Sequence, residues 1–505
     1  MLLALAAAFT LGCEGADGPT YGDDDGSDSD ADTDTDVDSD ADSDSDTDTE
    51  TDTEYTGPVI PPTCDDAADA KTSVGCDFFT LDIDNWTAAD PETFAIVVSN
   101  PHEDQNADIT LTHGNDSNVI YGVTLAPYEL HTINVACTSG CLVAPQQIEE
   151  QGIATGVGFH LTADVPILAY QWNPYGIELY STDASLLIPT TSLDGTYIAA
   201  AWNTGPGASW SYLNSQISVV ITEDNTKISF ISSTNVPEQG GVGPFTQGVE
   251  SGEYTLNAYD VISMRPVALD DDLTGTAILA DKPVVVFGGH SCANVPNGSY
   301  AACDHVEEQI LPLAAWGTST VLARHAVRSG CTEEQDQVVW RLIAGADDMT
   351  VYFDPPAPSP AGAEYYFAQQ GELLEFWGTD DHLVEGLFNN PDDPEEPEAP
   401  FFAYQMMMGC TFASCGASEG DPMMLQSPPA GQFLDRYVFS TDEVFDFDYD
   451  HIIIVRLAGT EVELDCAGVL GPEIFESVGS SDWEVGRFFI DNPENSTGCL
   501  DGAHV

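Results

Sequence analysis

The chain has 505 residues, 42% of them hydrophobic and 10% aromatic, which is enough apolar material for a sizeable core. Its 86 acidic residues face only 10 lysines and arginines, giving a formal net charge of −76. Such a surface repels phosphate groups, so it argues against nucleic acid and anionic membrane surfaces as partners and favours an exported protein screened by salt or calcium.

The N-terminus "MLLALAAAFTLGC" is a short apolar run followed at once by polar sequence. It is too short to span a bilayer, so residues 1–13 are predicted to be an export signal. Its end at Gly12-Cys13 resembles a bacterial lipoprotein signal, which would make Cys13 the lipidated residue. Thr10 and the lack of basic residues depart from that motif, and an ordinary secretory signal is the alternative. The lipid would be the only contact with a membrane.

Residues 14–63 are dominated by alternating Asp with Ser and Thr, as in "SDSDADTDTDVDSDADSD". This composition cannot build a core, and its like charges hold the chain extended. We therefore expect a disordered spacer. It lacks the ordered loop that a tight calcium site needs.

Twelve cysteines in an exported chain predict disulfides rather than zinc ligands, because the sequence has no C-x-x-C pair. If Cys13 is lipidated, eleven are left, so one has no partner. Neighbours along the chain suggest pairs that leave Cys331 over: Cys64–Cys76, Cys137–Cys141, Cys292–Cys303, Cys410–Cys415 and Cys466–Cys499.

From residue 64 onward the pattern predicts an all-β fold. Runs such as "FAIVVSN" and "ADITLTHG" are rich in Val, Ile and Thr and are bounded by turn residues. "VVITEDNTKISF" and "IIIVRLAGTEVEL" predict β-hairpins, with turns at Glu223–Asn225 and Ala458–Gly459.

The β pattern repeats with a period of 117 residues, marked by Pro166, Pro283 and Pro400 in "ADVPILAYQWNP", "ADKPVVVFGGHS" and "EAPFFAYQMMMG". Each copy continues with a segment from Asp to Pro, a strand, a predicted hairpin and a return strand. The predicted organisation is a repeated β domain over 64–505, with a half unit at 64–157 and units at 158–274, 275–391 and 392–505. Ends that are out of phase favour repeated antiparallel sheets in a propeller-like closed ring, with tandem β-sandwiches as the alternative.

Several long segments resemble the IgGFc-binding protein N-terminal domain family: "SNPHEDQNADITL", "TDASLLIPTTSLDGTYIAAAW", "DLTGTAILADKPVVVFGGHSCANVP" and "CDHVEEQILP". The resemblance covers about residues 74–505. Together with the N-terminus it is similar to bacterial, myxobacterial-type surface lipoproteins. It implies a secreted or surface-displayed binding protein; antibody Fc is the ligand of a mammalian member, and no binding residue can be carried over.

One segment approximates a catalytic motif. Gly289-His290-Ser291-Cys292-Ala293 follows a strand, as in the nucleophile elbow of hydrolases. The Pro and Gly residues that follow forbid the helix that this elbow needs. A secreted hydrolase using His290, Ser291 and His305 is therefore only an alternative to a loop tied by a disulfide.

Two weak metal sites complete the candidates. His305 and Glu308 could share a face if their segment were helical, and Asp446, Asp448 and Asp450 would share a face of a strand, where calcium could lie between them. A surface loop and an acidic edge strand are the alternatives, and no other cofactor is expected.

The sequence thus predicts a non-enzymatic cell-surface binding or adhesion protein, in the outer membrane or secreted, whose partner is an extracellular protein or glycan. The loops expected to bind are 171–182, 288–303 and 405–420, where the repeats differ most. The alternatives are the secreted hydrolase and a calcium-dependent structural component of the envelope or matrix.

Overall fold

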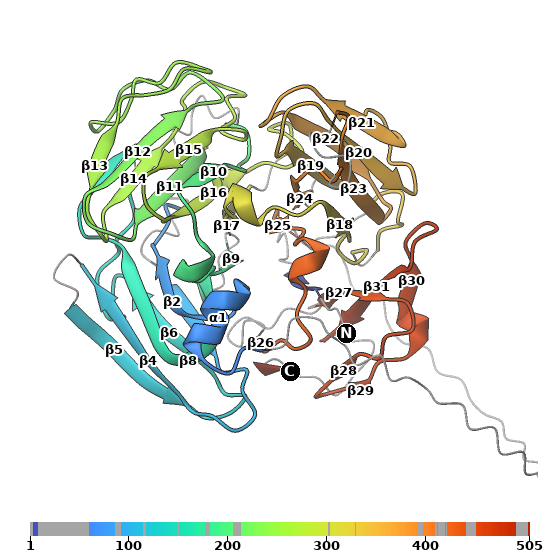
Figure 1. Cartoon of the computed structure of the whole chain (residues 1–505), viewed down its shortest axis with the longest axis horizontal. Helices are drawn as coiled ribbons and strands as arrows, with labels where there is room; N and C mark the ends of the chain where they lie inside the picture. The colour runs from blue at the N-terminus through green and yellow to red at the C-terminus, as the bar shows by residue number, and fades with distance from the viewer. Residues whose placement is uncertain are drawn as a thin grey trace, which may run out of the picture. The chain divides into compact units, whose positions relative to one another are not determined.

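The computed structural model describes residues 4–8, 60–85, 92–114, 118–148, 151–176, 182–205, 214–300, 303–328, 330–390, 397–409, 412, 420, 422–440, 451–490 and 503–504. This part of the chain is all-β, as predicted (Figure 1). The helical elements whose bounds the structure describes are α1 (Cys64–Ala70) and the short 3-10 turns η1 (Thr190–Ser192), η2 (Leu313–Ala315), η3 (Ala430–Gln432) and η4 (Pro472–Ile474). No helix within these ranges is long and apolar enough to cross a membrane.

The strands fall into three groups of eight and a remainder. The first group is β2 (Gly75–Thr80), β3 (Phe94–Ser99), β4 (Ala107–His113), β5 (Asn118–Leu125), β6 (Leu130–Ala136), β7 (Gly152–Ala154), β8 (Phe159–Asn173) and β9 (Asp183–Leu186). The second is β10 (Thr196–Ile198), β11 (Ser215–Ile221), β12 (Thr226–Ile231), β13 (Tyr254–Leu256), β14 (Val261–Met264), β15 (Ala277–Ala280), β16 (Val284–Ala293) and β17 (Asp304–Gln309).

The third group is β18 (Ser319–Leu322), β19 (Val338–Ala344), β20 (Met349–Asp354), β21 (Glu364–Phe367), β22 (Leu373–Gly378), β23 (His382–Phe388), β24 (Phe401–Met407) and β25 (Met424–Gln426). The remainder is β1 (Ala4–Ala8), β26 (Phe439–Ser440), β27 (His451–Leu457), β28 (Glu463–Leu464), β29 (Gly468–Val469), β30 (Phe475–Ser477), β31 (Trp483–Phe489) and β32 (Ala503–His504). We call the three groups of eight the first, second and third units.

Each unit repeats one topology of two antiparallel sheets. In the third unit the sheets have the orders β18-β23-β20-β21 and β22-β19-β24-β25, and in the second β10-β15-β12-β13 and β17-β16-β11-β14, with β7 added beside β14. In the first unit the long strand β8 runs through both sheets and joins them into one of seven strands. The remaining strands form a sheet of order β1-β27-β31-β30 and two strand pairs.

The two sheets of a unit enclose one hydrophobic core. In the third unit Leu322 and Val351 from one sheet share a cluster with Trp340 and Phe376 from the other. This is a β-sandwich. The expectation of a propeller-like closed ring is wrong for the described strands, which form separate sheets that face each other in pairs.

Both predicted hairpins are also wrong. β11 and β12 are joined by the predicted turn, yet β11 pairs with β14 and β16, whereas β12 pairs with β13 and β15. The chain therefore crosses from one sheet to the facing sheet at this turn. After the other predicted turn, β27 pairs with β1 and β31, and β28 pairs with β29. A short turn between two apolar strands is compatible with pairing and with crossing, so the sequence pattern does not distinguish them.

The units are fused through strands that are buried on both faces. In β19, Trp340 and Leu342 lie in the core of the third unit, whereas Val339 and Ile343 lie in the core of the second. In β11, Val219 faces the core of its own unit and Val220 the core of the first. Such strands are continuous apolar runs rather than alternating ones, because neither face meets water.

Candidate functional site

The three units meet where their last strands, β9, β17 and β25, lie against one another near the middle of Figure 1. Each strand is followed by a proline and a 3-10 turn: Pro189 before η1, Pro312 before η2 and Pro429 before η3. We call this region the junction. The sequence repeat therefore places three equivalent segments side by side, which no single unit could do alone.

Two neighbouring glutamates of β17 are buried in the junction. Glu307 is 0% exposed and Glu308 is 3% exposed. Gln171 of β8 donates its Nε2–H to Glu307 Oε1 at 2.8 Å. The Ser185 hydroxyl of β9 donates to Glu308 Oε2 at 2.9 Å, and the Gln426 backbone N–H of β25 to Glu308 Oε1 at 3.2 Å. All three units thus supply partners to one pair of carboxyl groups.

The network extends to Asp183 at the start of β9. Its Oδ2 accepts the backbone N–H of Glu307 at 2.9 Å and that of Met424 at 3.5 Å. On the other side, Gln309 Oε1 accepts the backbone N–H of Ile188 at 2.9 Å. Side chains here satisfy backbone groups of strands that are not in one sheet, which fixes the strands relative to one another.

Burial raises the pKa of two of these acids. Burial raises the pKa of Glu308 to about 8 and that of Asp183 well above its usual range, and nearby carboxylates add to both shifts. A protonated carboxyl avoids the desolvation cost of a buried charge and can donate a hydrogen bond. Glu308 therefore holds its proton near neutral pH inside this acidic cluster.

The segments that follow these three strands line a cavity of about 490 Å³, within the size range of small-ligand sites. Its lining comes mainly from the three 3-10 turns and the residues that follow them: Thr191, Ser192, Leu193, Asp194, Pro312, Ala314, Ala315, Gly317, Thr318, Ser319, Pro429, Ala430, Gly431 and Gln432, with Lys71 beside them. Gln432 donates to the Ala315 carbonyl at 2.8 Å and so ties two of the turns together. We call this space the junction cavity.

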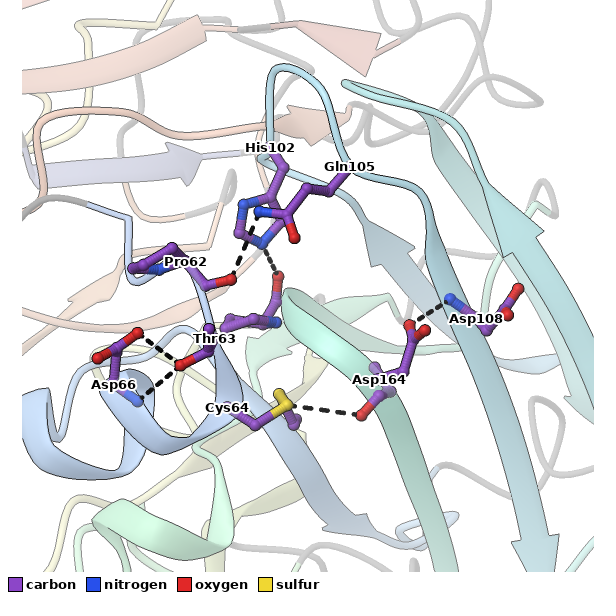
Figure 2. The surroundings of a disulfide bond; sticks show 11 residues. Pro62, Thr63, Cys64, Asp66, His102, Gln105, Asp108 and Asp164 are labelled. Carbon is purple, nitrogen blue, oxygen red and sulfur yellow. Dashed lines mark hydrogen bonds between the residues drawn. A yellow bond between two sulfur atoms is a disulfide. The ribbon is translucent and has the colours of Figure 1, made fainter.

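Lys71 reaches the junction cavity from α1, which is fixed at both ends. Figure 2 shows the start of the helix, where the Thr63 side chain accepts the N–H of Asp66 at 3.2 Å as an N-cap. A disulfide from Cys64 to Cys76 ties the helix to β2. At the other end Lys71 is the C-cap, with φ 51°, and its N–H bonds Ala67 O at 3.1 Å.

The predicted hydrolase residues lie inside a strand rather than in a loop. His290 and Ser291 belong to β16 and are 0% and 1% exposed. The expected binding loop 288–303 is therefore wrong for its first six residues, because both faces of β16 pack against other sheets. Loops 171–182 and 405–420 likewise begin in the buried strands β8 and β24.

The expected helical pairing of His305 with Glu308 is also wrong. Both residues lie in strand β17, where an odd spacing places them on opposite faces. His305 Nε2 instead lies 3.0 Å from Glu307 Oε2. Within the described ranges, no three or more His, Cys, Asp or Glu side chains are grouped so that they could hold a metal ion. Asp446, Asp448 and Asp450 lie outside the described residues.

The structure brings together Cys64 with Cys76, Cys137 with Cys141, and Cys292 with Cys303 in disulfides. The expectation that Cys331 is left over is wrong, because Cys331 is disulfide-bonded. Cys466 is also disulfide-bonded. Cys13, Cys410, Cys415 and Cys499 lie outside the described residues.

Sequence reasoning did not single out Lys71 or the buried Glu307 as site residues. A recurring segment from an acid to a proline was visible at 183–189 and 304–312, and it marks the strands that meet at the junction. The sequence does not indicate which turns line the cavity, because the lining residues come from segments more than 100 residues apart.

Comparison with known proteins gives one family and one relative. The model of the family described as "IgGFc binding protein" matches residues 183–504, which include β9, the second and third units and the three junction turns. The chain is 25% identical over 263 residues to the IgGFc-binding protein of Homo sapiens. That match covers 52% of this chain and 4% of the human protein, so the chain corresponds to a small part of its relative.

Proposed function

Because the chain belongs to the IgGFc-binding protein family, we propose that it is a non-enzymatic protein that binds an extracellular protein on a scaffold of fused β-sandwiches. The name of the human relative refers to the Fc region of IgG, and Fc is accordingly the first ligand to test. Since the relative is matched over a small part of its length, its ligand is carried to this chain only as a proposal.

The observation that carries this proposal is the contrast between the junction and the candidate catalytic residues. The junction presents a cavity lined by turns from three units, all within or beside the segment that the family model matches. Ser291 and His290 are enclosed in β16, where a substrate has no access without breaking strand pairing. The fused units thus bring turns from distant segments together, as a binding scaffold requires, whereas a hydrolase would need Ser291 and His290 to be exposed.

We expect immobilised full-length protein to bind human IgG Fc saturably, with an association rate that falls as NaCl is raised. The net charge of −76 steers basic surfaces toward the protein, and salt screens that attraction. Biolayer interferometry measures both rates. Fab, mucin and fibronectin serve as other extracellular ligands in the same assay.

Two results would contradict the proposal. One is the absence of binding to Fc and to every other protein of this panel. The other is cleavage of a panel protein or of an ester substrate that disappears in the Ser291→Ala variant, which would establish the hydrolase instead. The His305→Gln variant provides a second check, because it leaves a side chain of similar size in β17.

Surface display belongs to the same proposal. A lipid on Cys13 would anchor the chain, and the acidic spacer 14–63 would hold the sandwiches away from the membrane. Disulfides in the folded part support an oxidising, extracytoplasmic location. Mass spectrometry of the mature N-terminus tests the anchor, since an unmodified residue 13 would rule it out.

A further inference from the structure

Lys71 differs from every other basic side chain of this protein. All ten lysines and arginines lie in the described ranges, and nine of them form ion pairs: Lys227, Arg265, Lys282, Arg324, Arg328, Arg341, Arg436, Arg456 and Arg487. Lys71 has no ion-pair partner among the described residues, although the chain carries 86 acids. Its ammonium group is therefore available to a ligand.

The fold fixes the backbone position of Lys71 at the junction cavity. Lys71 lines the junction cavity, and its backbone is held by the C-cap of α1 and by the disulfide at Cys64. Ser192 of η1 donates to the carbonyl of the next residue, Thr72, at 3.0 Å. The backbone beside the lysine is thus tied to η1, which supplies one wall of the cavity, so the backbone of this segment is already ordered before a ligand binds.

The rest of the lining combines polar and apolar residues and holds no second lysine or arginine. Thr191, Thr318 and Ser319 contribute hydroxyl groups, and Asp194 contributes a carboxylate that can accept hydrogen bonds. Proline and alanine side chains of η2 and η3 supply apolar walls. A matching ligand carries one negative charge for Lys71 and several hydroxyl groups for the remaining partners.

We propose that the junction cavity binds an acidic sugar, a carbohydrate residue that bears one carboxylate, such as a uronic acid. Its carboxylate would pair with the Lys71 ammonium, and its hydroxyl groups would donate to Asp194 and exchange hydrogen bonds with Thr191, Thr318 and Ser319. The volume of about 490 Å³ accommodates a residue of this size. This site is separate from the protein ligand proposed above and does not depend on it.

Two other ligand chemistries fit the cavity less well. A phosphate dianion would meet one lysine, a lining carboxylate and a protein of net charge −76. The C-terminal carboxylate of a peptide would satisfy Lys71 but leave the hydroxyl groups of the turns without partners. A monoanion with hydroxyl groups satisfies both parts of the lining.

The test is isothermal titration of the full-length protein with methyl glucuronide in about 150 mM NaCl. We expect binding tighter than about 10 mM, weakened at least about tenfold in Lys71→Met and retained in Lys71→Arg. Methyl glucoside, which has a hydroxymethyl group in place of the carboxylate, is expected to bind at least about tenfold more weakly than the glucuronide. Acetylglycine, a carboxylate without hydroxyl groups, is expected to bind as weakly as the glucoside.

The matched control is Lys227→Met, because Lys227 is an exposed lysine paired with Glu253 at 3.0 Å and does not line the cavity. It should leave the titration unchanged, and circular dichroism of each variant checks folding. The proposal is overturned by equal affinity for glucoside and glucuronide, by tighter binding of acetylglycine, by unchanged binding in Lys71→Met, or by no glucuronide binding at about 10 mM. Binding of Fc in the separate assay is expected to persist in Lys71→Met, so failure here leaves the protein-binding proposal standing.

Discussion

Replacing Arg341 with methionine is expected to lower the free energy of unfolding by about 3–5 kcal/mol, because it leaves carboxylates without their partner at the contact between two units. The Arg341 side chain is 4% exposed. Its Nη2 lies 2.6 Å from Asp272 Oδ2 and its Nε lies 2.9 Å from Glu375 Oε2. Asp272 precedes β15 of the second unit, whereas Glu375 lies in β22 of the third.

The same side chain makes further contacts that methionine cannot replace. Its Nη1 donates to the Ala201 carbonyl at 2.8 Å and to the Tyr404 hydroxyl at 3.0 Å. The guanidinium carbon lies 4.6 Å from the centre of the Trp202 ring, in cation–π geometry. Ala201 and Trp202 belong to the second unit, so Arg341 connects the two units through hydrogen bonds, ion pairs and stacking at once.

Urea unfolding followed by tryptophan fluorescence measures this effect. Arg341→Lys is expected to recover only part of the loss, because an ammonium cannot reproduce the fork of the guanidinium. Arg436→Met is the control: Arg436 pairs with Glu103 at 2.8 Å on a more exposed surface, and its loss should cost no more than about 1 kcal/mol. A change in Arg341→Met as small as that of the control would show that the contact is not a stabilising link.

The second large effect is a dependence of stability on pH that originates at Glu308. Burial raises the pKa of this carboxyl to about 8 in the folded protein, above its usual value of 4.5. Between these two pH values Glu308 holds a proton in the folded state that it releases in the unfolded state. Its contribution to the free energy of unfolding is therefore fully present below about pH 4.5 and is lost as the pH rises through 8. One such group removes about 2 kcal/mol of stability between pH 6 and pH 8.

The Glu308→Gln variant removes this titration and keeps the shape of the side chain. We expect its melting temperature to change less between pH 6 and pH 9 than that of the parent protein and to exceed it at pH 9. Part of the dependence should persist, because the pKa of Asp183 is also raised by burial. Glu476→Gln, a substitution on exposed β30, is the control and should follow the parent. Parallel pH curves for the parent and Glu308→Gln would refute the role of Glu308.

The strands and their recurrence could be predicted from the sequence because they depend on local patterns. Runs such as "ISVVI" and "VVWRLIA" are rich in β-branched and other apolar residues, and both form strands that are buried along their whole length. Pro166, Pro283 and Pro400 recur at equivalent places in the three units, within β8 or just before β16 and β24. The sequence does not predict that the chain crosses to the facing sheet after β11 and after β19. Which sheet each of these strands joins depends on pairing with strands far away in the sequence.

The candidate site could not be predicted for a related reason. The segment "DHVEEQ" carries four titratable residues, a composition that favours solvent exposure. Glu307 and Glu308 are buried because Gln171, Ser185 and Gln426, each more than 100 residues away, supply their partners. Lys71 stands out only because it has no ion-pair partner among the described residues. This can be recognised only after the ion pairs of the other nine lysines and arginines are known.

The core shared by the second and third units has a mechanical consequence. Independent domains joined by linkers unfold one after another under tension, because each domain keeps its own core when its neighbour unfolds. Here Val339 and Ile343 of the third unit lie in the core of the second, so unfolding one unit strips apolar cover from the next. Under a pulling force the two units should therefore unfold together in a single step.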